Sequence, residues 1–487
     1  MPPCVSPPAP PRPRGVLLAY TWGNGPSSCS PYFMRSWVAL SDHARSNTDL
    51  VILFEGKEKP CAGEPAGADA QYLRMPADVL ASLKATKLNP AAYRMRAFVW
   101  WLELPENVAK RYGYVGVLDT DMIFQDDIFD RVHAYDLAQQ KQGTDVLHLV
   151  AENSAERNDG YTAKRLRGYP GCNRALMSYL TNASILPRLD SGNTDDDLSV
   201  VERLEARVEK MRAELAALKK SLTAASAAPG RRLRSRRSSS AASAAVLANA
   251  TLPPAVQGFW DRFGATHRLN FGSMFGTRRA LIGLCNQVVD VLVGPMSTCW
   301  DQGMLNVVSW TGLVAAAQPS LRVLVWDCFE GPVKTLDVGA LRDANGRFYN
   351  ERGALYPIVH QFRPTRQSKF VSDLGRIFPP RNASNDRAYH RRVAWQTTLF
   401  ERPLQRVPFV WDDKRRMERL AAQMKASGLP DPADPARPLP PTLPPCATPS
   451  VMYKPAAERD ALGGVKGDAW EGMAAGGYVL PPRKAAS

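Results

Sequence analysis

The feature that most constrains this chain is a short apolar segment that runs directly into two carboxylates. Residues 114–118, YVGVL, are followed by Asp119-Thr120-Asp121 and then by a second apolar run at 122–124. Five apolar, β-prone residues predict a buried strand. Burying two unpaired carboxylates at the end of a strand is costly, so they must be paired, solvated or bound to a cation.

The spacing of the two acids favours a cation. Side chains at i and i+2 of an extended chain lie on the same side, so Asp119 and Asp121 can face one divalent ion. Such ions prefer oxygen ligands, and a bound metal can hold a diphosphate. The alternative is a turn that Asp119 caps while Asp121 is solvated. The apolar strand before the pair favours metal binding.

An α/β fold is predicted by the opening of the chain. Apolar runs at 15–20 and 49–54 predict strands, and a helical segment at about 32–43 lies between them. This β-α-β order predicts a mostly parallel sheet flanked by helices, with ligands beyond the carboxyl ends of the strands. Thr21 and Trp22 follow the first strand and are therefore candidate substrate-binding residues.

A predicted helix at 93–104 directly precedes the acidic pair and carries Arg94 and Arg96 near its start. Guanidinium groups match phosphate oxygens, so both arginines are candidate diphosphate ligands. The alternative is a solvated helix face or an ion pair with Glu103. His148, within a later predicted strand, is interpreted as a core histidine.

Two later sequence motifs belong with the acidic pair. Residues 269–272 read LNFG before a predicted helix at about 278–292, and residues 300–306 read WDQGMLN. Asp301 alone is explained as a helix cap. In this order the three motifs resemble glycosyltransferase family 8, the glycogenin-like group of GT-A glycosyltransferases, over roughly residues 15–183 and 259–370.

The resemblance implies a GT-A-like sheet and a metal-dependent, retaining transfer of a sugar from a nucleotide diphosphate. A UDP-sugar is the favoured donor, and the acceptor is a glycan, protein or lipid. If Asp301 instead acts as a base on the acceptor, the enzyme inverts. Phe271 replaces the small polar residue usual in the family. The positions that match the donor-sugar pocket are Asn270, Gly272, Asp301, Gln302 and Asn306.

The resemblance also implies a histidine that completes the metal site. His360 follows a strand-like run at 356–359, and imidazole binds Mn²⁺, with Mg²⁺ the alternative ion. A histidine without a metal is the other interpretation. Arg363 follows where the family has a glycine-and-lysine pattern, and it is a further candidate diphosphate ligand.

The sequence predicts five parts. An a/d heptad seam from Val201 to Leu222 predicts a short coiled coil for a partner or for self-association, and a basic low-complexity run follows it. The parts are a disordered Pro-rich N-terminus at 1–14, a nucleotide-sugar-binding part at 15–183, an insertion at 184–258, the rest of the catalytic domain at 259–378, and a Pro-rich, partly ordered tail at 379–487.

Composition narrows the class of protein. The net charge is +15, but the basic run carries part of it without interleaved aromatics, so nucleic-acid binding is not favoured. The eight cysteines include no C-x-x-C pair, which disfavours structural zinc and leaves disulfides open. No apolar run reaches the roughly 18 residues of a spanning helix. We expect the Golgi or secretory lumen if an anchor precedes this chain, and the cytoplasm otherwise.

Two other functions stay open at this point. A nucleotidyltransferase also needs paired carboxylates and a metal, but its loop after the first strand usually carries a cation, which TWGNGPSS does not. A non-enzymatic scaffold that uses the coiled coil would not need the acidic pair.

Overall fold

The computed structural model describes a core of the chain: residues 12–21, 29–40, 45, 47–61, 70–85, 92–138, 145–152, 158, 161–167, 170–182, 254–292, 299–311, 321–326, 331–335, 340–342, 347–350, 355–360, 405–407 and 422. The predicted coiled coil, the basic run and most of the Pro-rich tail lie outside these residues. The chain divides into two compact units, 1–176 with 263–487, and 177–262. Every site residue discussed below belongs to the first unit.

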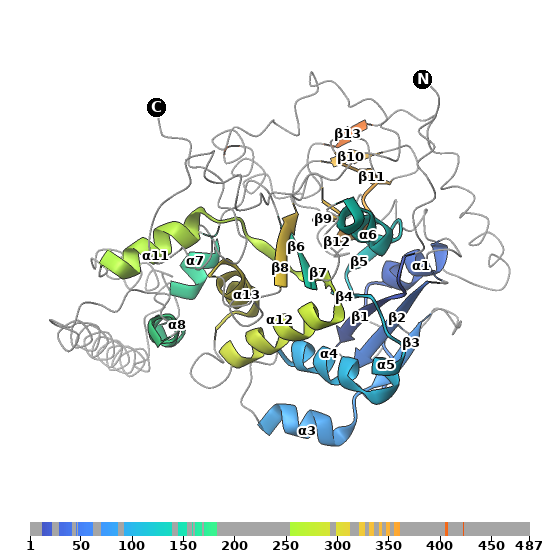
Figure 1. The fold of residues 1–487 in the computed structure, drawn as a ribbon, viewed down its shortest axis with the longest axis horizontal. Helices are drawn as coiled ribbons and strands as arrows, with labels where there is room; N and C mark the ends of the chain where they lie inside the picture. Colours follow the sequence, from blue (N-terminus) through green and yellow to red (C-terminus); the bar gives the residue numbers. More distant parts are fainter. Residues whose placement is uncertain are drawn as a thin grey trace, which may run out of the picture. The chain divides into compact units, whose positions relative to one another are not determined.

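A seven-stranded sheet forms the centre of the first unit, in the order β3-β2-β1-β4-β7-β6-β8 (Figure 1). Only β7 runs antiparallel to its neighbours β4 and β6. This confirms the predicted mostly parallel α/β sheet and is consistent with a GT-A-like fold. The strands are β1 (Gly15–Thr21), β2 (Thr48–Phe54), β3 (Gln71–Arg74), β4 (Tyr114–Leu118), β6 (Asp145–Ala151), β7 (Leu269–Gly276) and β8 (Leu321–Trp326).

The central strands are buried on both faces, and the sequences of β1 and β4 are almost continuously apolar. Every residue of β1, β4 and β7 is buried. Parallel strands covered by helices on both sides have this pattern, whereas a half-exposed strand alternates apolar and polar residues. His148 in β6 is fully buried, which agrees with its interpretation as a core residue.

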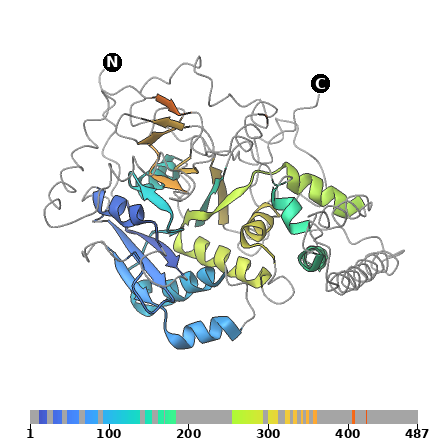
Figure 2. The ribbon, with the colours of Figure 1, turned by 180° about the vertical axis from the view of Figure 1, so that it is seen from behind.

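Helices cover the two faces of the sheet. Phe275 of β7 packs with Phe129 of α6 in the main apolar cluster, which also contains Trp37 of α1. The next residue, Gly276, lies against Leu281 of α12, so α12 covers the opposite face. Figures 1 and 2 show α4 beside α12 from either side. The helices are α1 (Pro31–Ala39), α3 (Ala77–Ala85), α4 (Tyr93–Glu103), α5 (Pro105–Ala109), α6 (Ile128–Ala138), α7 (Tyr161–Arg167), α8 (Pro170–Asn182), α11 (Pro254–Ala265), α12 (Arg278–Val291) and α13 (Asp301–Trp310).

Two three-stranded sheets adjoin this core. One has the order β5-β12-β9, from β5 (Met122–Phe124), β12 (Ile358–His360) and β9 (Val333–Thr335). The other has the order β11-β10-β13, from β11 (Phe348–Tyr349), β10 (Ala340–Arg342) and β13 (Gln405–Val407). Strand β13 comes from the range predicted as tail. The first small sheet matters most for function, because it pairs β12 with β5, the strand that follows the acidic pair.

The folded domain begins earlier than the predicted boundary at residue 15. Arg12 is buried and forms ion pairs with Asp127 and Asp130, and it donates to Thr48 Oγ1 at 2.8 Å. A buried guanidinium needs such partners, so Arg12 is part of the fold rather than of a disordered N-terminus.

Two disulfides join described residues, Cys29–Cys61 and Cys172–Cys299. Cys285 is a free, buried cysteine, and burial raises the pKa of its thiol to about 12. Within the described part of the chain, no helix is both long and apolar enough to span a bilayer.

Candidate metal centre

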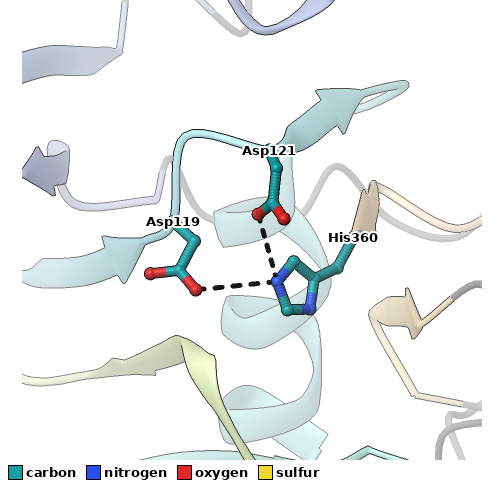
Figure 3. Close-up of side chains that lie close together, drawn as sticks. All are labelled: Asp119, Asp121 and His360. Atoms are coloured by element: carbon teal, nitrogen blue, oxygen red, sulfur yellow. Dashed lines mark ion pairs between the residues drawn. The ribbon is translucent and has the colours of Figure 1, made fainter. Parts of the chain in front are cut away.

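Asp119, Asp121 and His360 meet at the carboxyl end of β4 (Figure 3). His360 Nε2 lies 3.7 Å from Asp119 Oδ2 and 3.3 Å from Asp121 Oδ1. The three candidate ligand atoms lie within 4.8 Å of one another. The structure therefore brings together the three residues predicted as metal ligands.

Strand pairing explains how residues so far apart in sequence meet. The chain leaves β4 at Leu118, turns through the acidic pair and enters β5, which pairs antiparallel with β12. In that register His360 lies opposite Met122, the residue after Asp121. The turn is held from both sides, because Asp119 N–H donates to the Gly272 carbonyl at 2.8 Å and Ser30 N–H donates to the Thr120 carbonyl at 3.0 Å.

Gly272 leaves space between the ligand atoms. A Cβ at this position would lie 2.6 Å from Asp119 Oδ2 and 2.7 Å from His360 Nε2, closer than any real side chain approaches. The glycine lies in the irregular stretch of the β6–β7 pairing, between Leu269 and Met274, and such irregularities are common beside functional sites. Two carboxylates and an imidazole around this space form a donor set suited to Mn²⁺. The residues present fit a divalent metal.

The neighbouring carboxylates determine the pKa of His360. His360 is buried, with 4 % of its surface exposed. Burial acts to lower its pKa, but the charges of Asp121 and Asp119 and their hydrogen bonds raise the pKa to about 10. The metal-free site therefore holds a proton on His360 at neutral pH, and a cation that binds at Nε2 must displace it.

Arg94 links the metal centre to α13. Its guanidinium pairs with Asp119 through Nη1 and lies 3.4 Å from Asp301 Oδ2 through Nη2. It also stacks on Phe271, 4.1 Å from the ring centroid. Burial acts to raise the pKa of Asp119, but the charges of Arg94 and His360 hold it below its usual range. The structure thus places Arg94 at the site as a partner of two carboxylates.

Arg96 is not brought to this site. Residues two apart on a helix point about 200° apart, so Arg94 and Arg96 lie on different faces of α4. Arg96 is exposed and donates to Asn286 Oδ1 of α12 at 3.3 Å.

The start of α13 lies against the amino end of β7. Asp301 Oδ1 accepts from the Gln302 backbone N–H at 2.8 Å. Gln302 Nε2 donates to Glu152 Oε2 at 2.6 Å and to the Leu269 carbonyl at 3.0 Å. Asn306 is fully buried, and its Oδ1 accepts from Leu269 N–H at 2.7 Å. Asn306 therefore fixes α13 to β7.

Sequence reasoning missed the buried Glu152, which lies directly after β6. Its Oε2 accepts from Arg268 Nε at 2.5 Å and from Gln302. Burial acts to raise the pKa of Glu152, but Arg268 and Gln302 lower it. The signal was available, because Glu152 ends an apolar strand just as Asp119 does.

Of the remaining candidates, the structure describes only Thr21. Thr21 is buried at the carboxyl end of β1, and its carbonyl accepts from Glu55 N–H at 3.2 Å. Trp22 and Arg363 lie outside the described residues.

Comparison with known proteins finds likeness among solved structures but not among sequences. No protein-family model matches the sequence, and no curated protein matches it. Among solved structures, the apo crystal structure of mouse xyloside xylosyltransferase 1 matches with 12% sequence identity and a TM-score of 0.29. The match covers 72% of this chain and 99% of that chain. A likeness of this size does not identify an activity.

Proposed function

We propose that this chain is a metal-dependent glycosyltransferase that moves a sugar from a nucleotide diphosphate to a glycan, protein or lipid. The observation that carries the proposal is the meeting of Asp119, Asp121 and His360 beyond the carboxyl edge of a mostly parallel sheet. Ligands of open α/β sheets bind at that edge. A UDP-sugar donor and retention of configuration rest on the family-8 resemblance of the sequence motifs.

Mn²⁺ or Mg²⁺ would be held by these three side chains and would neutralise charge on the leaving diphosphate. Arg94 would add a positive charge beside Asp119, with its geometry fixed by two carboxylates and the Phe271 ring. A guanidinium anchored in this way is preorganised, so little further ordering is needed when an anionic donor binds.

Asp301 and Gln302 would orient the donor sugar. Both carboxylate oxygens of Asp301 are engaged. One accepts a hydrogen bond from Gln302 N–H, and the other forms an ion pair with Arg94. A carboxylate with both oxygens engaged is a poorer base for an acceptor hydroxyl, which favours retention over inversion. Gln302 is fixed through Nε2 by Glu152 and Leu269, so its amide has a defined orientation.

We further propose that the protein works in the Golgi or the secretory lumen. The two disulfides support this, because disulfides persist in oxidising compartments and are rare in the cytosol.

The test is donor binding and hydrolysis with and without Mn²⁺, across UDP-glucose, UDP-galactose, UDP-N-acetylglucosamine, UDP-xylose and GDP-mannose. The wild type is compared with Asp121→Ala and with Asp78→Ala, which removes an exposed carboxylate from the first turn of α3. We expect metal-dependent turnover that Asp121→Ala abolishes and Asp78→Ala retains. Turnover that survives Asp121→Ala, or no binding of any donor, would refute the proposal.

A further inference from the structure

The side-chain amide of Asn270 contacts other residues of the chain through both of its polar atoms. The family resemblance places it in the donor-sugar pocket, yet only 2 % of its surface is exposed. Its Oδ1 accepts from Gly272 N–H at 2.7 Å. Its Nδ2 contacts Thr335 Oγ1 at 3.1 Å and His360 Nδ1 at 2.7 Å.

These contacts engage both polar atoms of the amide. A carboxamide has two N–H donors and one carbonyl oxygen. With Oδ1 on Gly272 N–H and Nδ2 beside Thr335 and His360, a sugar hydroxyl reaches the Asn270 amide only if one of these contacts breaks. Breaking a contact at a buried amide leaves a polar group unsatisfied, which costs about 1–3 kcal/mol.

We propose, on the basis of the function proposed above, that Asn270 and Thr335 are positioning residues for His360 rather than ligands of the donor sugar. The amide lies on the Nδ1 side of the imidazole, and Nε2 faces Asp119 and Asp121. A hydrogen-bonding partner at the far ring nitrogen fixes the orientation of a metal-binding histidine.

Thr335 is the outer member of this arrangement. It ends β9, is fully buried, and pairs in register with His360 on the parallel strand β12. Its hydroxyl contacts the Asn270 amide and thereby limits how the amide turns. Because Thr335 lies behind Asn270 and is buried, it reports on His360 positioning without touching a donor.

The amide can serve His360 in the metal-bound state as well. With a cation on Nε2, the ring proton resides on Nδ1, which then needs an acceptor. Turning the amide brings Oδ1 to Nδ1, where the Thr335 hydroxyl can also donate to it, but the turn removes the acceptor of Gly272 N–H. An aspartate at position 270 would accept from both Gly272 N–H and His360 Nδ1, so the Asn270→Asp variant should bind metal at least as well as wild type.

The test measures the affinity of the full chain for Mn²⁺ alone, by isothermal titration and electron paramagnetic resonance. Removing a partner of a metal-binding histidine usually weakens metal binding about 10- to 100-fold, and we expect this for Asn270→Ala. Thr335→Val, which keeps the side-chain shape, should weaken it about 3- to 10-fold, at the lower edge of such effects. Thr335→Ser keeps the hydroxyl and should match wild type. The donor KM of Thr335→Val at saturating Mn²⁺ should stay unchanged.

The opposing outcomes are distinct. If Asn270→Ala and Thr335→Val bind Mn²⁺ like wild type, the positioning role is wrong, and a raised donor KM in Asn270→Ala alone would return Asn270 to the sugar pocket. If Asn270→Ala does not fold, the comparison of Thr335→Val with Thr335→Ser decides. If wild type binds no Mn²⁺, the metal centre fails and this role with it. Wild-type Mn²⁺ binding without any donor turnover would overturn the transferase and leave the positioning role standing.

Discussion

Replacing Gly272 by alanine should strongly weaken metal binding while leaving the fold largely intact. The added methyl would lie 2.6 Å from Asp119 Oδ2, 2.7 Å from His360 Nε2 and 2.8 Å from His360 Cε1. Real Cβ atoms do not approach other heavy atoms within 3.0 Å, so both ligand side chains must move. The methyl also fills the space between the two atoms that would hold the ion.

The size of the effect follows from how many ligands are lost. Displacing two of three protein ligands should weaken Mn²⁺ binding by more than the loss of one ligand's hydrogen-bonding partner does, so we expect at least about 100-fold. That factor corresponds to about 2.8 kcal/mol of binding free energy. Isothermal titration with Mn²⁺ measures it directly.

Gly116→Ala is the matched control. A Cβ there would lie 2.7 Å from Leu17 Cδ2 and 2.8 Å from Phe275 Cδ1, inside the apolar core and away from the metal centre. This variant should lower the thermal midpoint and keep the wild-type affinity for Mn²⁺. If Gly272→Ala binds Mn²⁺ as tightly as wild type, the metal is not held where the three side chains meet.

Four further predictions follow from the charges and cross-links. Mn²⁺ binding should tighten about tenfold per pH unit between pH 6 and 9, because the cation displaces one proton from His360, whose pKa is about 10. Mn²⁺ titrations across that pH range measure the change in affinity, and an affinity that does not vary with pH would contradict the prediction. In the metal-free protein, His360 should stabilise the fold fully below pH 6.5, and the thermal midpoint should lose this contribution as pH rises through 10, because the folded-state pKa is raised. Arg94→Ala should lower the free energy of unfolding in urea by about 2 kcal/mol, because Asp119 loses its buried cation, whereas an unchanged urea midpoint would show that the pair adds no stability. Replacing both Cys172 and Cys299 by serine should lower the free energy of unfolding by about 4 kcal/mol, since they are 127 residues apart, and equal urea midpoints would refute this.

The fold was largely predictable because its signals are local. The apolar run before Asp119 became β4, and the run before His360 became β12. Buried parallel strands are almost uniformly apolar, so they stand out in a single sequence. The spacing of Asp119 and Asp121 predicted that they share one ion, but the addition of His360 was predicted only through the family resemblance, because nothing local in the sequence specifies the pairing of β5 with β12.

The features that sequence reasoning missed depend on the direction in which side chains point and on tertiary contacts. Arg94 and Arg96 were treated alike, although helix geometry sends two such residues to different faces. Asn306 was assigned to the donor pocket, but its amide holds the backbone of β7. Thr335 has no sequence signal at all, because its role arises only when β9 pairs with β12. The cysteine pairing likewise follows from tertiary structure rather than from spacing.

The register of β12 against β5 has a consequence for the stability of the fold. An ion held by Asp119, Asp121 and His360 would also be a removable cross-link between the turn after β4 and a strand of only three residues. A ligand that binds only the folded state stabilises it by about 2.7 kcal/mol at one hundred times its dissociation constant. The local concentration of the cation would therefore govern the stability of the native domain as well as its rate of turnover. A chelating environment would lower both.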